Sequence, residues 1–325
     1  MEVQKLYCGI DISGATLDVC FQKKDGGFEW GKVVNSPTGF KELWKLTGEG
    51  YHFVMEHTGV YQLPLCFFLE SKKCGYSVVN ALQIKRYIQM HLERNKTDKK
   101  DARHICQYGI DRNPECYQMP DLLYFECKAL NNAIETMTQE TTSFKNKIFA
   151  QSKLKIDNAA VLKAYNSVLK EMGKELKKLE KVLEAKLHCW QPELKTLVSS
   201  VTGIGKRASA VLIVSTQGFK YTETYQQLIS YAGLSPREYS SGSSIRGKVR
   251  ICKQGGSQLR HTLYMCALNA KSTNPACKEL FERLVAKGKN KKLAIIAVCN
   301  KLLKQVFAVV RSGQPYDKNY IAKTA

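Results

Sequence analysis

The chain has 325 residues, 44% of them hydrophobic, which is enough for two or three domains with buried cores. Its net charge of +21 and pI near 9.4 indicate a polyanionic partner, with nucleic acid favoured over an anionic membrane. The most apolar stretches, such as residues 293–299, are too short to span a bilayer, and the first residues do not resemble a signal peptide, so we expect a cytoplasmic protein without a membrane partner.

The first hundred residues alternate between strand and helix patterns. Residues 7–13 and 16–22 predict a hairpin of apolar strands, and residues 28–35 predict a third strand. Thr38 is expected to cap the helix that follows. A strand, a helix and a further strand are then predicted at 52–57, 63–73 and 76–81. A hairpin followed by strand–helix units is the order of an RNase H-like sheet, which we assign to a first domain over residues 1–120.

The next segment, residues 121–193, is rich in Lys, Glu and Leu, and its apolar residues recur three or four apart from Leu162 to Leu187. This spacing predicts a helical, coiled-coil arm that serves as a spacer or in dimerisation. Pro192 ends it, and residues 194–325 predict a third, mainly helical domain. The fold class is therefore α/β plus α.

Four carboxylates stand where an α/β domain gives them no obvious structural role. Asp11 interrupts an apolar strand, and Glu56 does the same in the strand at 52–57. Asp98 and Asp101 are three apart on a helix predicted to begin near Thr97, so they face the same side.

Together these four side chains can hold two Mg²⁺ ions, because hard cations prefer oxygen ligands and a metal pair can stabilise both oxygens of a phosphodiester under attack. Each residue also has an ordinary explanation: Asp11 can begin a turn, Glu56 can pair with a lysine, and Asp98 can lie in the favourable first turn of a helix. Their combination in this order of elements favours the metal site.

Residues 239–247, YSSGSSIRG, place four serines around Gly242 and are followed by Lys248 and Arg250. Composition alone does not distinguish a polar turn from a segment with a reactive hydroxyl. The surrounding charge is strongly positive, since residues 241–325 contain 17 Lys and Arg but 3 Asp and Glu. We therefore expect the C-terminal part to form the main surface for a polyanion.

Twelve cysteines are spread from Cys8 to Cys299 without any C-x-x-C spacing. This distribution predicts free, mostly buried thiols in a reducing compartment, and it argues against disulfides or a zinc site.

These motifs carry a family resemblance that extends over nearly the whole chain. GIDIS, MEHTGVY and RNKTDKKDAR, which contain the four carboxylates, resemble the RuvC-like domain of the bridge-RNA-guided insertion-sequence recombinases, DEDD transposases related to the Piv invertases. VTGIGKRASAVLI, YAGLSPREYSSGSSIRG and CKQGGSQLRHTLYMCA, at 201–213, 231–247 and 252–267, resemble that family's transposase domain.

The resemblance implies a bacterial, RNA-guided and Mg²⁺-dependent DNA recombinase. A structured noncoding RNA would pair with both donor and target double-stranded DNA, and strand exchange would pass through a covalent phosphoserine. By its place in the SGSS motif the nucleophile is Ser241, combined with the carboxylates of another subunit in a dimer or tetramer. Relatives can have an acidic residue directly before the motif serine, whereas this chain has Ser240 there, which makes Ser240 a second candidate nucleophile. Ser243 and Ser244 are weaker alternatives.

Basic residues around the serine motif are candidates for contacts with phosphates. They are Arg246, Lys248, Arg250, Lys253, Arg260 and Lys206. Lys206 ends TGIGK, which is consistent either with a helix-hairpin-helix phosphate site or with a tight turn between helices. Ser257 is expected to cap a helix that carries Arg260. Thr202 and His57 depart from the family pattern without removing a functional atom.

Two other functions remain open on the sequence. A RuvC-type structure-specific endonuclease would use the four carboxylates with water and two metals, and the serine segment would be a loop. A non-catalytic nucleic-acid-binding protein would use the positive charge alone. Element ends and a structured noncoding region beside the gene would favour the recombinase, and a DNA-repair operon would favour the nuclease.

Overall fold

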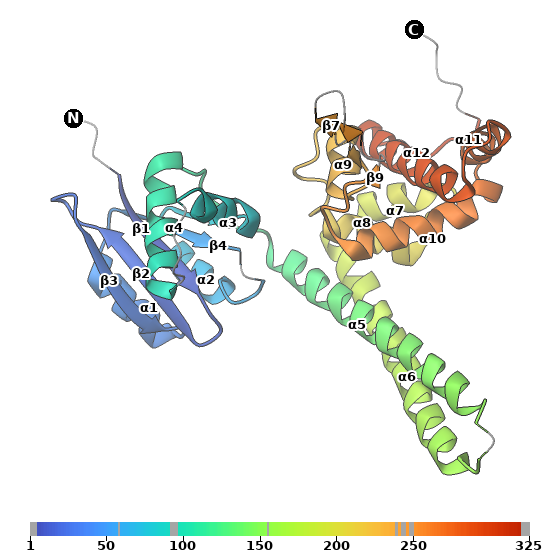
Figure 1. Cartoon of the computed structure of the whole chain (residues 1–325), viewed down its shortest axis with the longest axis horizontal. Helices are drawn as coiled ribbons and strands as arrows, with labels where there is room; N and C mark the ends of the chain where they lie inside the picture. The colour runs from blue at the N-terminus through green and yellow to red at the C-terminus, as the bar shows by residue number, and fades with distance from the viewer. Residues whose placement is uncertain are drawn as a thin grey trace, which may run out of the picture. The chain divides into compact units, whose positions relative to one another are not determined.

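The computed structural model describes residues 5–57, 59–91, 97–154, 156–237, 240–241, 245–246 and 250–319. The chain divides after Met119 into two compact units (Figure 1). The first unit is mixed α/β, and the second is mostly helical. The structure thus has the α/β plus α composition that the sequence predicts.

The first unit is built on a five-stranded sheet with the strand order β3-β2-β1-β4-β5. Its strands are β1 (Leu6–Ile12), β2 (Thr16–Gln22), β3 (Phe28–Val34), β4 (Tyr51–Glu56) and β5 (Tyr76–Val79). The first three pair antiparallel, while β4 is parallel to β1 and to β5. The central position of β1 explains why it is mostly apolar and buried along its length.

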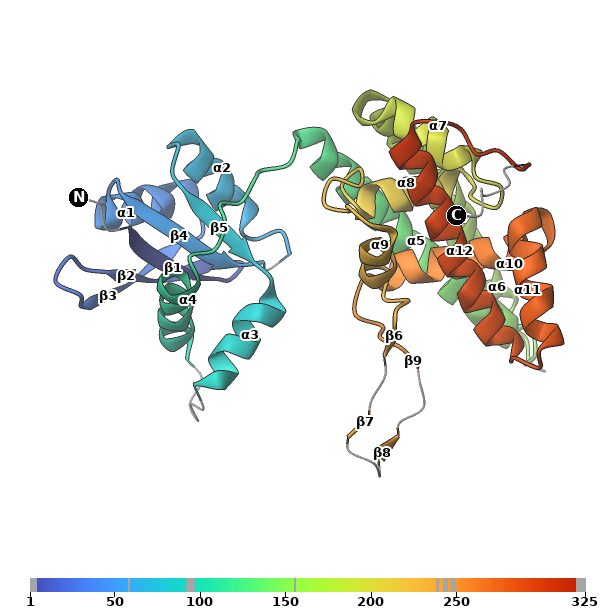
Figure 2. The same ribbon diagram turned by 90° about the horizontal axis from the view of Figure 1, so that it is seen from above.

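Helices cover both faces of this sheet (Figures 1 and 2). They are α1 (Pro37–Thr47), α2 (Leu63–Ser71), α3 (Ala81–Met90) and α4 (Asp98–Arg112). On one face α1 and α2 pack with alternate strand residues such as Ile10 and Phe53. On the other face α3 and α4 pack with the intervening residues, including Tyr7, Cys20 and Val54. This alternation fixes which side chains of each strand lie beneath α4.

Helix α4 lies unusually close to β1, and two glycines permit this contact. A Cβ atom on Gly9 would stand 2.1 Å from the backbone nitrogen of Cys106 and 2.4 Å from the carbonyl oxygen of Ala102. A Cβ atom on Gly109 would stand 2.7 Å from Cδ1 of Tyr7. Because these separations are shorter than real Cβ contacts, a side chain at Gly9 would require movement of the helix backbone, and one at Gly109 would require movement of Tyr7 or of the helix.

The second unit begins with a hairpin of two long helices and continues with shorter helices and two small ribbons. Its elements are α5 (Leu122–Gln151), α6 (Ala159–Trp190), α7 (Pro192–Ser200), α8 (Lys206–Ser215), α9 (Tyr225–Tyr231), β6 (Pro236–Arg237), β7 (Ser240–Ser241), β8 (Ile245–Arg246), β9 (Arg250–Ile251), α10 (Ser257–Thr273), α11 (Pro275–Ala286) and α12 (Lys291–Ser312). Helices α5 and α6 run side by side as an arm that extends away from the other helices of the unit (Figure 1).

Helix α12 contains a longer apolar stretch than residues 293–299, the stretch considered from the sequence. Its 22 residues meet the length and composition of a membrane-spanning helix, so the expectation that every apolar stretch is too short was wrong. Val298, Leu302 and Val306 are nevertheless fully buried, and the helix packs against α7, α9, α10 and α11. It is therefore the core helix of this unit.

Two predicted helix caps differ from the structure. The cap of α1 is Ser36, whose hydroxyl accepts from the Gly39 amide, because the helix begins at Pro37, before the expected Thr38. Ser257 is the first residue of α10, and Gly256 precedes it without any side-chain cap. All twelve cysteines are free and eight are buried, as the sequence predicts for the thiols themselves.

Candidate functional site

Asp11 and Glu56 lie at the same end of two neighbouring parallel strands. The register pairs Ile10 of β1 with Met55 of β4, so the next residue on each strand is an acid. Both acids continue the alternation of the face that α4 covers, because Gly9 contacts α4 and Val54 belongs to the core beneath it. Their carboxyl groups therefore share one edge and one face of the sheet.

The N-terminus of α4 brings Asp98 and Asp101 to this edge. The Thr97 hydroxyl caps the helix by accepting from the Lys100 amide, which places both acids in the first turn. At the other end of α4, the Tyr7 hydroxyl donates to Oδ1 of Asn113 over 2.7 Å. Because the C-terminal end of α4 lies near the start of β1, its N-terminal end lies near Asp11. A helix N-terminus is also the favourable end for carboxylates.

Burial and neighbouring acids together disfavour the ionised form of Asp11. Burial raises the pKa of Asp11 from 3.8 to about 6, and the charges of Asp101, Asp98, Glu56 and Asp18, in decreasing order, add to the effect. The ionised form of Asp11 is thus disfavoured by its own surroundings. The structure brings together the carboxylates that the sequence singles out.

This edge has the donor chemistry for a hard divalent cation but is not a closed cage. Within the described residues, no three His, Cys, Asp or Glu side chains are placed closely enough to hold a metal ion. Carboxylate oxygens are the ligands that Mg²⁺ prefers, and a cation at Asp11 would reverse the unfavourable field that raises its pKa. The donor chemistry therefore suits a divalent ion, whereas the side chains as placed in the described residues do not enclose one.

Sequence reasoning missed a fifth carboxylate, Asp18, which faces Asp11 across the β1–β2 ladder. Asp18 is 5% exposed, and Lys32 of β3 forms an ion pair with it at 3.0 Å. The signal was an acid among apolar residues in TLDVCFQ, the same anomaly that marked Asp11. Its position opposite Asp11 depends on the register of the hairpin.

A side-chain amide joins the segments that follow β1 and β4. Nδ2 of Asn35 donates to the carbonyl oxygen of Ser13 at 2.9 Å and to that of Tyr61 at 3.1 Å. Ser13 follows β1, and Tyr61 lies in the segment between β4 and α2. Asn35 therefore links the segment after Asp11 to the segment after Glu56.

The serine motif belongs to the second unit, and only part of it is described. Ser240 and Ser241 form β7, where Ser241 pairs with Ile245 and Ser240 with Arg246 of β8. Residues 238–239, 242–244 and 247–249 lie outside the described residues, so the predictions for Ser243, Ser244 and Lys248 are not tested. The hydroxyls of β7 and the guanidinium of Arg246 are also outside what the structure describes.

Strands β6 and β9 connect this segment to the helices of the second unit, and β7 and β8 lie beyond them (Figure 2). Arg250 and Lys253 are exposed beside or within this region. Lys253 has a positive φ of 56°, which fixes an unusual backbone turn before α10. Arg260 is partly buried, and its Nη1 atom donates to the carbonyl oxygen of Ala232 at 3.3 Å. Arg260 thus also has a structural role.

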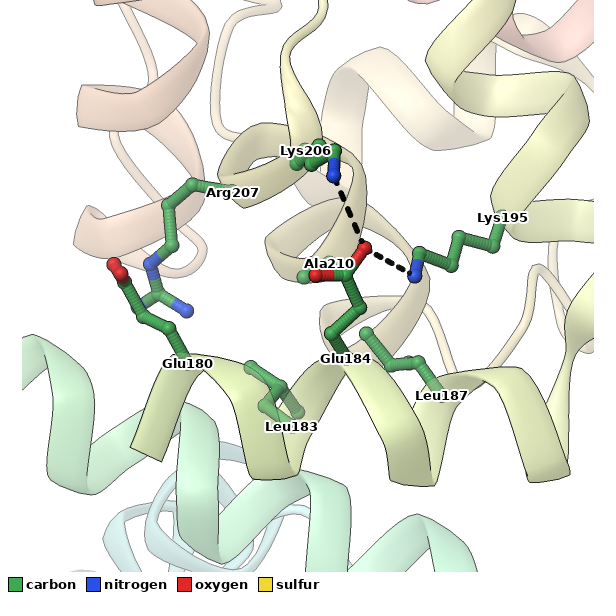
Figure 3. Close-up of a pocket in the computed structure, with 8 residues that line it drawn as sticks. All are labelled: Glu180, Leu183, Glu184, Leu187, Lys195, Lys206, Arg207 and Ala210. Carbon is green, nitrogen blue, oxygen red and sulfur yellow. Dashed lines mark hydrogen bonds and ion pairs between the residues drawn. The ribbon is translucent and has the colours of Figure 1, made fainter. Parts of the chain in front are cut away.

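Lys206 begins α8 directly after the TGIG turn, beside a cavity of about 170 Å³ (Figure 3). One carboxylate oxygen of Glu184 lies 2.9 Å from Nζ of Lys195 and 3.4 Å from Nζ of Lys206. The two amines hold the pKa of Glu184 below its usual range. The Lys206 side chain remains 81% exposed, so its amine is accessible to a phosphate group of a bound nucleic acid.

Comparison with known proteins assigns the chain to a family. Residues 8–155 match a DEDD transposase domain of the IS110 type, and residues 195–282 match the domain described as transposase of the IS116/IS110/IS902 family. The pilin gene-inverting protein of Moraxella bovis is 31% identical over 330 residues, which cover 97% of this chain and 99% of that protein. The chain belongs to the IS110 family of transposases.

Two further relatives agree with this assignment. The pilin gene-inverting protein of Moraxella lacunata has the same identity and coverage. An uncharacterized 43.6 kDa protein of insertion element IS110 from Streptomyces coelicolor is 32% identical over 124 residues, 38% of this chain and 30% of that protein.

As a member of the IS110 family, the protein is a transposase or recombinase, an enzyme that acts on DNA. The first family match contains all four carboxylates, and its DEDD type indicates the use of divalent metal ions. The second match contains Ser241. The structure and the family therefore agree in placing acidic and serine motifs in separate parts of one enzyme.

Proposed function

We propose that this IS110-family enzyme is an RNA-guided, Mg²⁺-dependent DNA recombinase that cuts and exchanges strands between donor and target DNA through a phosphoserine at Ser241. A structured noncoding RNA would select both double-stranded DNAs by pairing. The family assignment supports recombination, and the relatives named as pilin gene-inverting proteins are consistent with the rearrangement of DNA segments.

The observation that carries this proposal is the convergence of four acids at one edge of the first unit. Asp11 and Glu56 come from neighbouring strands, and Asp98 and Asp101 come from the first turn of the helix across them. This arrangement supports an RNase H- or RuvC-like assignment for the first unit. Bound Mg²⁺ would supply Lewis-acid polarisation of the phosphodiester. The carboxylates would hold the ion and orient the phosphate.

Ser241 would then act as the nucleophile. Its Oγ atom would form a bond to phosphorus and lose its proton, while the bond from phosphorus to the deoxyribose oxygen breaks and that oxygen takes up a proton to leave as a hydroxyl, so that protons balance. The bond energy is retained in the protein–DNA ester, so a second deoxyribose hydroxyl can reverse the reaction on another strand. Attack by water would hydrolyse the phosphodiester without forming such an ester. A serine nucleophile is therefore suited to strand exchange, and water is suited to a nuclease.

The positive C-terminal part would bind the nucleic acids. The residues assigned to phosphate contacts are Arg246, Lys248, Arg250, Lys253, Arg260 and Lys206. Exchange between two duplexes requires at least two serines, which supports a homodimer or a tetramer, with the α5–α6 arm as a candidate contact between subunits. A bacterial enzyme with these partners would work in the cytoplasm on the nucleoid.

The experiment that tests this function is the recovery of a covalent intermediate. The protein is incubated with guide RNA, Mg²⁺ and a DNA whose reaction is trapped before exchange, and the digested complex is analysed by mass spectrometry. We expect a nucleotide on the peptide spanning residues 239–246, absent in Ser241→Ala and retained in Ser240→Ala. The alanine deletes one oxygen from a polar segment, so folding and nucleic-acid binding should persist. Cleavage at a normal rate by Ser241→Ala would replace this mechanism with water-dependent hydrolysis.

A further inference from the structure

Four charged side chains form a row across four adjacent strands on the face that α4 covers. Glu56 and Asp11 occupy β4 and β1, Asp18 faces Asp11 from β2, and Lys32 faces Asp18 from β3. Residues that face each other across an antiparallel ladder lie on the same side of a sheet. The sequence of charges along this row is therefore three negative and one positive.

The pairing of Asp11 with Asp18 is unfavourable as ordinary sheet structure. Like charges directly opposite on neighbouring strands repel, and Asp18 is also buried, with only 5% of its surface exposed. Lys32 offsets part of this effect through its 3.0 Å ion pair with Asp18. Because Lys32 lies on the side away from Asp11, it stabilises Asp18 without occupying the space between the two acids.

A second ion pair on the same hairpin shows what a purely structural pair looks like. Lys23 and Glu29 are 3.1 Å apart near the opposite end of β2 and β3, and both side chains are 47% exposed. In the Lys32 pair, by contrast, the Asp18 side chain is 7% exposed. Burial of the acid and its position opposite Asp11 distinguish the Lys32 pair from the exposed Lys23 pair.

We propose that Asp18 is a positioning residue of the carboxylate site and that Lys32, by partly neutralising Asp18, sets the affinity of the site for divalent metal ions. This inference rests on the proposed metal site at Asp11. The negative charge of Asp18, next to Asp11, attracts a cation to this edge of the sheet. Lys32 offsets part of that negative charge, so that the protein stays folded without a bound metal ion.

The proposal predicts opposite effects for the two partners of one ion pair. Asp18→Asn keeps the shape of the side chain but removes its charge, and it should weaken divalent binding about 10- to 100-fold, as for other residues that support a metal ligand. Lys32→Gln leaves Asp18 fully negative and should tighten binding by about 3- to 10-fold, a smaller change because Lys32 is half exposed. A merely structural ion pair would give the same sign for both variants.

The test is a titration of full-length, nucleic-acid-free protein with Mg²⁺ by calorimetry and with Mn²⁺ by electron paramagnetic resonance. Lys23→Gln is the matched control, because it changes the net charge by the same amount on the same hairpin and should leave the affinity unchanged. Thermal melting in EDTA records the stability of each variant separately from its metal affinity.

The outcomes separate this inference from the function on which it rests. Weaker binding in Asp18→Asn with tighter binding in Lys32→Gln supports it. Parallel losses in both variants, or no change in either while Asp11→Asn abolishes binding, would overturn it and leave the metal site intact. If Asp11→Asn binds both ions like the unaltered protein, the metal site and this inference both fall.

Discussion

At the scale of single residues, the surroundings of Asp11 disfavour its ionised form. Burial and four neighbouring acids raise its pKa from 3.8 to about 6. A raised pKa in the folded protein means that the contribution of Asp11 to stability is fully present below about pH 3.8 and is lost as the pH rises through about 6. Near neutral pH the metal-free fold therefore contains an anion that a divalent cation would stabilise.

The corresponding prediction concerns stability without metal. In EDTA at pH 7.5, Asp11→Asn should be more stable than the unaltered protein, by at most about 3 kcal/mol before solvent screening reduces the effect. The difference should shrink as the pH falls below about 6 and vanish only well below 3.8, where Asp11 is protonated in both folded and unfolded chains. Thermal or urea denaturation across this range measures it. A variant that is less stable at pH 7.5 would show that Asp11 is not strained by its surroundings.

Residues differ in how far the sequence reveals them. Asp11 and Glu56 stand out because each interrupts an apolar strand, and Asp98 and Asp101 stand out because they are three apart on a predicted helix. Their combination predicts a metal site, and the resemblance adds to that interpretation. Asp18 interrupts a strand in the same way, but its importance depends on the register that places it opposite Asp11. Lys32 carries no local signal, since a lysine on an edge strand is usually a solvated surface residue.

At the scale of elements, the contact between β1 and α4 positions the candidate site. Two acids come from the sheet and two from the helix, so a small movement of α4 separates one pair from the other. Gly9 permits the close approach, because any Cβ atom there would overlap the backbone of Ala102 and Cys106. The same contact explains a glycine in the middle of an otherwise apolar central strand.

We predict that Gly9→Ala displaces α4, lowers the free energy of unfolding by about 1–3 kcal/mol or more, and abolishes DNA cleavage. Gly14→Ala is the control in the same unit, because its Cβ atom would make an ordinary 3.4 Å contact with Tyr61. Chemical denaturation and a strand-cleavage assay on both variants provide the measurement. Normal cleavage by a folded Gly9→Ala protein would mean that the helix position does not control the site.

The sequence predicts which segments are strands and helices more reliably than where each helix begins or which of its residues are buried. All five strands of the sheet are predicted, because alternation and short apolar runs are strong signals. The cap of α1 was misplaced because Ser36 and Thr38 both have capping side chains, and only the start of the helix at Pro37 distinguishes them. In α6 the apolar spacing predicts a seam, yet only Leu183 and Leu187 are buried there, since a two-helix arm leaves most of its surface exposed.

At the scale of the whole molecule, the carboxylates and the serine belong to different compact units of the chain. The family matches also separate them, with the acids in the first match, which continues to residue 155 in the second unit, and Ser241 in the second match. Neither part contains both the proposed nucleophile and the proposed metal ligands. The account therefore requires that separate units, from different subunits in our proposal, meet on one phosphodiester.

Mixing two inactive variants tests this central claim most directly. Asp11→Asn retains Ser241, and Ser241→Ala retains the carboxylates, so each alone should form no covalent adduct with DNA. When the two are mixed with guide RNA and Mg²⁺, a subunit of each kind can complete one site. We predict that the adduct returns and that mass tags place it on the Asp11→Asn subunit. A mixture that forms hybrid oligomers without any adduct, or an adduct on the subunit that lacks Ser241, would contradict the account.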